Sequence, residues 1–148
     1  MPTKTKGFFW LLLKDTLNMR GLLRRRNMYL ESYTCENCIL QLEETLPHLF
    51  LRCNFAKNCW NAIGVISPRT TCPQRAVYRI KMQLDVPFRM EIVILMSWSI
   101  WKCRNGWLFD NRNPPVKACV DGLKQELLCL VHRAPSYKSA IEEWITSF

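Results

Sequence analysis

Residues 34–53 read TCENCILQLEETLPHLFLRC, and this stretch decides how the rest of the chain is interpreted. Two cysteines separated by two residues stand near its start, and a histidine and a cysteine separated by four residues stand near its end. Zinc prefers four sulfur or imidazole ligands in a tetrahedron, and a Cys-x2-Cys pair supplies two of them from one tight turn. The residues that fit this ligand set are Cys35, Cys38, His48 and Cys53.

A site of three cysteines and one histidine leaves no open position on the metal, so a zinc ion here is predicted to be structural. Binding requires thiolates and a neutral imidazole, which couples folding to the metal and to pH. The second ring nitrogen of His48 is expected to donate to a carboxylate, with Glu43 and Glu44 as the candidates. We therefore expect one Zn²⁺ per chain.

Spacing alone leaves two other interpretations open. The four side chains could be ordinary buried residues, since free cysteine is among the most buried residue types. Cys59 could also complete an all-sulfur site in place of His48. If residues 54–63 form a helix, however, Cys59 lies more than one turn from Cys53, and we prefer His48.

Around this stretch, apolar residues recur at helical spacing and no segment has a convincing period of two. Thr45 and Asn54 are the expected N-caps of two short helices, Gly64 ends the second, and Asn105-Gly106 ends a long apolar helix whose dipole suits Lys102 and Arg104. The expected helices are two short ones within residues 8–25, one that carries His48, and others over 54–63, 74–84, 88–105, 116–131 and from 135 onward.

The predicted fold class is therefore all-α, a small helical domain with a zinc-knuckle-like loop and a helical C-terminal extension. We expect residues 1–64 to form the zinc-binding domain and residues 65–148 to form the extension that packs on it. At 148 residues and 49% hydrophobic content the chain can bury a real core. The stripe over 116–131 leaves a protein partner open for the C-terminal helices.

Composition also limits the location of the protein. The longest uncharged apolar run, Ile92 to Trp101, is far shorter than the ~20 residues that span a bilayer, so no membrane association is expected. The apolar run near the start is too short for a secretion signal. The eight cysteines are sparse, and reduced thiols are expected. We expect an intracellular protein, nuclear or cytoplasmic.

The positive charge is unevenly placed. The net charge is +9, and residues 1–26 hold seven Lys or Arg against Asp15 alone, which gives +6. This asymmetry favours an anionic partner, nucleic acid before membrane, although a solvated basic face is the alternative. The side chains expected to contact phosphates of RNA or DNA are Lys14, Arg20, Arg24, Arg25 and Arg26.

The sequence contains no pattern typical of an enzyme. There is no polymerase carboxylate pair, no phosphate-binding glycine-rich loop and no nucleophile with a matching base, and His132 has no obvious partner. Trp98 and Trp101 could stack on bases, but apolar neighbours on nearly every side favour core packing. We expect neither catalysis nor a small-molecule substrate.

The central stretch also resembles a known family. Thr34 to Cys38, Glu43 to Cys53, and then Phe55-Ala56 and Trp60, resemble the zinc-binding domain that follows the polymerase domain in plant LINE-type (non-LTR) retrotransposon proteins. The likeness covers about residues 8–63, and WSIWKCRN at residues 98–105 is similar to a stretch found downstream in such proteins. One departure is Ile39, where zinc knuckles often place glycine after the second cysteine.

The resemblance implies zinc on Cys35, Cys38, His48 and Cys53, and retroelement ancestry. It implies a non-catalytic accessory domain of a reverse transcriptase that binds RNA or DNA with little sequence preference. The alternative is a structural or protein-interaction remnant of a retrotransposon protein that does not bind nucleic acid.

Overall fold

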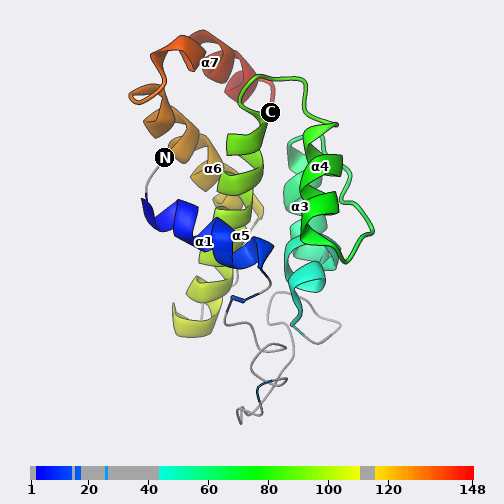
Figure 1. Ribbon diagram of the computed structural model, residues 1–148. Coiled ribbons are helices and arrows are strands. Elements are labelled where there is room, and N and C mark those ends of the chain that lie inside the picture. The colour runs from blue at the N-terminus through cyan, green and yellow to red at the C-terminus, as the bar shows by residue number, and fades with distance from the viewer. Residues whose placement is uncertain (1–2, 15, 18–25, 27–43, 111–115) are drawn as a thin grey trace.

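The computed structural model describes residues 3–14, 16–17, 26, 44–110 and 116–148. Every regular element in these ranges is helical, so the all-α prediction is confirmed (Figure 1). The elements are α1 (Thr3–Leu13), a π-helical turn η1 (His48–Arg52), α3 (Asn54–Ala62), α4 (Pro73–Lys81), α5 (Arg89–Asp110), α6 (Val116–Val131), a 3-10 turn η2 (Pro135–Tyr137) and α7 (Lys138–Thr146).

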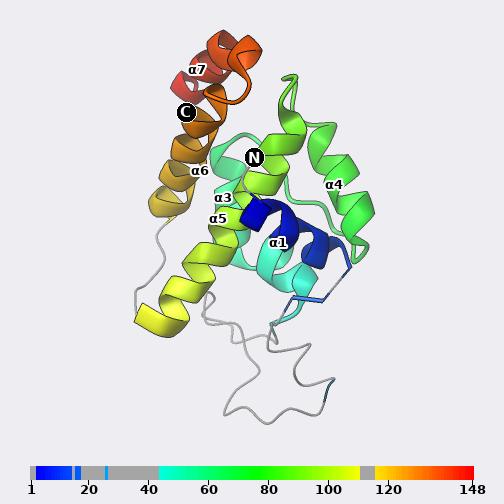
Figure 2. The same cartoon turned by 60° about the vertical axis from the view of Figure 1, so that its left-hand side comes forward.

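Helix α5 is the centre of the arrangement. It contacts α1, α3, α4 and α6, and Figures 1 and 2 both show α1 crossing it. Because it has neighbours on several sides, apolar residues are buried around most of its circumference, as the sequence predicts. Its fully buried side chains include Ile92, Leu95, Met96 and Ile100.

The predicted end of this helix at Asn105 is wrong, because α5 continues to Asp110. The side chain of Asn105 accepts a hydrogen bond from Arg104 through its Oδ1, at 2.9 Å. A glycine inside a helix costs only about 1 kcal/mol relative to alanine, which tertiary contacts routinely outweigh. Lys102 and Arg104 therefore lie within the helix and not at its negative end.

The end of α3 is predicted correctly. Gly64 has a φ of 80°, in the left-handed region that favours glycine. Its N–H donates to the carbonyl of Asn61 at 2.9 Å, and the N–H of Val65 donates to the carbonyl of Trp60 at 2.9 Å. This pair of bonds is a Schellman motif, and the completely buried Val65 supplies its apolar contact.

Both predicted parts of the chain contribute to one hydrophobic core. Phe8 of α1 and Trp60 of α3 belong to the same buried cluster as Ile100, Leu123 and Ile141 from the C-terminal helices. A division of the chain at residue 64 stays a prediction. The shared core means that each part covers apolar surface of the other.

The two tryptophans of the WSIWKCRN stretch pack on this core, as expected. The ring of Trp98 meets Phe8 edge to face at 5.2 Å, and the ring of Trp101 stacks on Phe50 at 6.3 Å. Phe8 also lies 6.0 Å from Trp101, so one aromatic cluster joins α1, η1 and α5. These rings are therefore not a surface for stacking bases.

The structure of the C-terminal helices agrees closely with the prediction from the sequence. Helix α6 has the predicted bounds, and its stripe of Cys119, Val120, Leu123, Leu127 and Leu130 is buried. After the turn η2, α7 returns along α6, and Trp144 meets Phe88 edge to face at 6.0 Å.

Among the described residues, no helix has the length and apolar character needed to cross a membrane.

Candidate metal centre

The segment that leads to His48 is organised by Thr45. The Oγ1 of Thr45 accepts a hydrogen bond from the backbone N–H of His48 at 3.4 Å, and its carbonyl accepts one from Leu49 at 2.8 Å. This is the N-cap contact that the sequence predicts for Thr45. The element that follows is a single π-helical turn and not an α-helix.

The π-helical turn links the two described candidate ligands. The N–H of Cys53 donates to the carbonyl of His48 at 2.7 Å, a bond between residues five apart. Single π-turns are rare and occur frequently at functional sites. Both side chains are buried, with His48 7% exposed and Cys53 1% exposed. An imidazole and a thiol thus lie at the two ends of one turn, and both are suitable zinc ligands.

Two hydrogen bonds from side chains outside the turn explain why η1 is π-helical and not α-helical. The indole Nε1 of Trp60 donates to the carbonyl of Phe50 at 2.8 Å, and the Oγ of Ser67 donates to the carbonyl of Leu51 at 2.5 Å. In a continuous α-helix, these carbonyls would pair with backbone N–H groups four residues later. The side chains of Trp60 and Ser67 satisfy them instead, so the chain is able to leave the helical path at Cys53.

Cys53 itself separates η1 from α3. Its ψ of 139° is extended, and its carbonyl accepts the N–H of Lys57 at 2.9 Å, the first bond of α3. Cys53 is therefore the N-cap residue, and the expected capping by Asn54 is wrong because Asn54 is already the first helical residue. This extended position between two helical elements separates Cys53 from the regular face of either one.

Cys59, the alternative ligand, points toward a different part of the core. Its thiol acts on that of Cys119 on α6, whose Sγ donates a hydrogen bond to the Sδ of Met96 at 3.6 Å. A hydrogen bond with Cys103 lowers the pKa of the Cys119 thiol, but the hydrogen bond with Cys59 and burial outweigh it, so the pKa is raised. This placement favours His48 over Cys59.

The other half of the predicted ligand set, Cys35 and Cys38, lies outside the described residues. Within the part of the chain that the structure describes, no group of three or more His, Cys, Asp or Glu side chains could hold a metal ion. His48 and Cys53 fit zinc by donor type and burial, but they need the Cys-x2-Cys pair to complete a tetrahedron. The four-ligand set stays a prediction.

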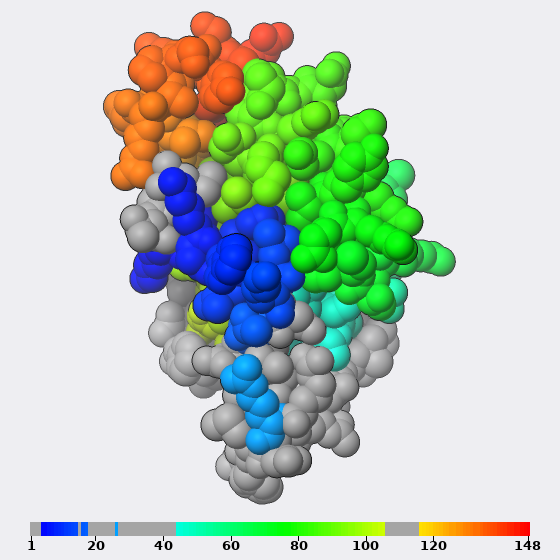
Figure 3. Space-filling model, in the orientation of Figure 1, coloured from blue at the N-terminus to red at the C-terminus, as the bar shows by residue number. Residues whose placement is uncertain are grey.

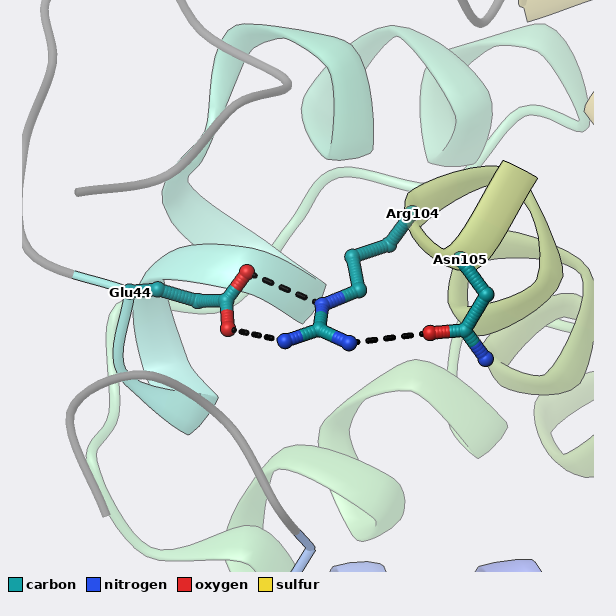
Figure 4. Close-up of polar contacts among 3 residues, drawn as sticks. All are labelled: Glu44, Arg104 and Asn105. Atoms are coloured by element: carbon teal, nitrogen blue, oxygen red, sulfur yellow. Dashed lines mark hydrogen bonds and ion pairs between the residues drawn. The ribbon is translucent and has the colours of Figure 1, made fainter. Parts of the chain in front are cut away.

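A buried ion pair stands immediately before the π-helical turn (Figure 4). The carboxylate of Glu44 accepts two hydrogen bonds from Arg104, one from Nη2 at 2.8 Å and one from Nε at 3.1 Å. The side chain of Glu44 is 0% exposed and that of Arg104 is 8% exposed. The Arg104 guanidinium also lies 4.8 Å from the ring of Trp101. Two parallel bonds and a stacked face are the geometry that arginine provides and lysine does not.

This pair joins segments 60 residues apart, and sequence reasoning missed it. The sequence predicts Arg104 at the end of a helix, whereas it lies inside α5. The signal was present, since Glu44 and Arg104 belong to the two stretches that resemble the family, residues 43–53 and 98–105. The expected contact between a glutamate and His48 stays a prediction.

The predicted phosphate contacts are only partly described. Lys14 and Arg26 are exposed, and the Lys14 ammonium lies 4.8 Å from the exposed ring of Trp10. Arg20, Arg24 and Arg25 lie outside the described residues. The structure therefore leaves the predicted cluster as a whole untested.

Comparison with known families bears directly on this segment. Residues 1–60 match the family described as zinc-binding in reverse transcriptase. The resemblance is thereby confirmed for this part of the chain. All four predicted zinc ligands and all five predicted phosphate contacts fall within the match, whereas Arg104 and helices α4 to α7 lie beyond it. Neither a curated protein nor a solved structure matches the chain.

Proposed function

We propose that this chain is a non-catalytic accessory domain in which one structural Zn²⁺ is held by Cys35, Cys38, His48 and Cys53. The observation that carries the proposal is the match of residues 1–60 to a zinc-binding reverse-transcriptase family. The burial of His48 and Cys53 at the ends of one turn supports it. A zinc ion with four protein ligands cross-links the chain and leaves no position for substrate.

Metal analysis of the reduced, purified protein tests the site. We expect one zinc per chain, with loss of zinc in His48→Ala and in Cys53→Ser. Cys129→Ser is the matched control, because Cys129 is exposed on α6 and its removal should leave zinc content unchanged. A zinc content near zero in the wild-type protein, or retention in His48→Ala together with loss in Cys59→Ala, contradicts this ligand set.

We further propose that the basic N-terminal segment binds RNA or DNA through phosphates, with little sequence preference. The +6 charge on residues 1–26 and the exposure of Lys14 and Arg26 support this role. Phosphate neutralisation releases counterions, so affinity should fall as salt rises, with a slope of about 0.9 per duplex phosphate contacted. The protein then works beside a polymerase and does not itself catalyse polymerisation.

Titration at several salt concentrations tests this second part. Replacing Arg24, Arg25 and Arg26 together with Gln should weaken binding to all sequences and flatten the salt slope, while zinc content is unchanged. Replacing the exposed cations Lys117, Arg133 and Lys138 with Gln removes the same charge from the C-terminal helices and is the control. If the wild-type protein binds no nucleic acid at low salt, the structural-remnant interpretation replaces this one.

A further inference from the structure

Helix α4 carries a basic and aromatic surface that lies beyond the family match. Arg75, Tyr78, Arg79 and Met82 are exposed, and their spacing of three, four and seven residues from Arg75 places them on one side of the helix. Tyr78 is 63% exposed. The buried residues Ala76 and Ile80 hold the opposite side against the core. The charged side of α4 is therefore presented to solvent.

Helix α1 presents a similar stripe. Lys6, Trp10 and Lys14 follow one another at intervals of four residues, and all three are exposed. Trp10 is 62% exposed, although tryptophan is on average a highly buried residue. Lys14 lies over its ring at 4.8 Å. Phe8 and Leu12 anchor the other side of α1 in the core.

The two stripes lie on neighbouring helices. Helices α1 and α4 are in contact, and the Nε2 of Gln74 donates to the carbonyl of Leu13 at 3.2 Å. Lys14 follows Leu13 directly and Arg75 follows Gln74, so the C-terminal end of α1 meets the N-terminal end of α4. Figure 3 shows α1 in blue against α4 in green on one face of the molecule.

The charge of these two segments is entirely positive. Residues 3–14 and 65–82 contain no Asp or Glu. None of their cations forms an ion pair with another described residue, so their charges are available to an external anion. These cations are Lys4, Lys6, Lys14, Arg69, Arg75, Arg79 and Lys81.

We infer that α1 and α4 together bind single-stranded nucleic acid, with Trp10 and Tyr78 as stacking surfaces for bases and with Lys6, Lys14, Arg75 and Arg79 as phosphate contacts. Cations interleaved with exposed aromatic rings are the combination that single strands require. Bases in a duplex are already paired and stacked, so they cannot lie on these rings. The inference rests on the proposed nucleic-acid binding, and it adds the strand form and a second group of contacts outside the matched segment.

The test compares ligands that share phosphates but differ in bases. The full-length protein is titrated, by fluorescence anisotropy, with labelled oligo-deoxythymidylate, with oligo-uridylate, with an abasic phosphodiester of the same length and with duplex DNA. We expect both single strands with bases to bind at least about tenfold more tightly than the abasic chain. Equal affinity for the abasic chain, or tighter binding of the duplex, overturns the inference.

Ring variants then locate the stacking. Trp10→Leu and Tyr78→Leu keep apolar bulk at exposed positions and should each weaken binding to oligo-deoxythymidylate about tenfold, with no change for the abasic chain. Trp10→Phe should retain most of the affinity because it retains a ring. Leu128→Ala removes an exposed apolar side chain from α6 and should have no effect. Unchanged affinity in both Leu variants contradicts the stacking role.

Charge variants distinguish the inference from the proposed function. Arg75→Gln with Arg79→Gln should lower the salt slope for single strands by about 0.7 per lost contact, whereas Arg133→Gln with Lys138→Gln should not. If the wild-type protein binds, and only replacement of Arg24, Arg25 and Arg26 weakens it, the α1–α4 surface is wrong and the proposed function stands. If no ligand binds, both fail.

Discussion

The buried side chains of residues 44–53 and those of the α5–α6 contact are buried by different means. Helices α5 and α6 meet through apolar side chains such as Ile100, Leu123 and Leu127, all fully buried. The 44–53 segment places a carboxylate, an imidazole and a thiol in the interior. Burying apolar surface is favourable simply because it removes that surface from water. Burying each of these polar groups is unfavourable unless the group has a specific partner. The α5–α6 contact should therefore tolerate local change better than residues 44–53.

Metal removal should have the largest effect and should separate the two regions. In zinc-finger peptides, structural zinc contributes about 10 to 16 kcal/mol of apparent binding free energy, which is more than a small segment can lose and stay folded. After chelation, we expect amide hydrogen exchange to rise mainly over residues 31–63, while α6 and α7 keep their protection. Cys53→Ser should reproduce the pattern, and Cys129→Ser should not. Uniform loss across α5, α6 and α7 would show one cooperative unit instead.

Breaking the buried ion pair should have the next largest effect. Arg104→Ala leaves the carboxylate of Glu44 buried without its bidentate partner and should lower the free energy of unfolding by about 3 to 5 kcal/mol. Urea denaturation, followed by far-UV circular dichroism, measures the change.

A double variant tests whether the loss of stability comes from burying a charge without Arg104. Glu44→Leu combined with Arg104→Met replaces the pair with apolar groups of similar size and should restore much of the lost stability, since such replacements are often neutral or stabilising. If the double variant is as unstable as Arg104→Ala, the pair contributes geometry that apolar packing cannot replace.

Replacing the glycine that ends α3 should lower stability by a smaller amount. Gly64 has a φ of 80° and open space where a Cβ would stand, so Gly64→Ala adds only the backbone cost of a left-handed alanine, about 1 to 2 kcal/mol. Thermal denaturation measures it. Gly7→Ala is the matched control, because Gly7 lies inside α1 with equally open space and alanine there should stabilise the helix by up to about 1 kcal/mol. Equal effects of the two changes would contradict this account.

The solvent-exposed ion pair between α5 and α6 should show the smallest effect. The Nζ of Lys102 lies 3.6 Å from the carboxylate of Glu126, and the two side chains are 46% and 27% exposed. Because solvent screens the charges and side-chain entropy is lost, such pairs contribute only about 0 to 1 kcal/mol to stability. Glu126→Gln should therefore lie within that range in the same urea titration, and Glu44→Gln well above it. A large loss of stability in Glu126→Gln would contradict the expected difference between the exposed and the buried ion pair.

Much of the fold can be predicted because the deciding patterns are local. The apolar stripe of α6 repeats at helical spacing, and its bounds of Val116 and Val131 follow from it. Gly64 ends α3 because the left-handed conformation is set by its own backbone. The N-cap contact of Thr45 depends only on residues three positions apart. The zinc-binding resemblance belongs here too, because its cysteine and histidine spacing is read directly from residues 34–53.

The sequence by itself determined the helical class, the bounds of α6 and the likeness of residues 1–60 to a zinc-binding family. Only the tertiary structure decided that α5 continues past Asn105, that a π-helical turn joins His48 to Cys53, and that Glu44 pairs with Arg104. These features depend on groups distant in the chain: Trp60 and Ser67 take the carbonyls that an α-helix would use, and a guanidinium arrives from 60 residues away. Local propensities differ by about 1 kcal/mol or less per residue, so a single buried contact is enough to overrule them.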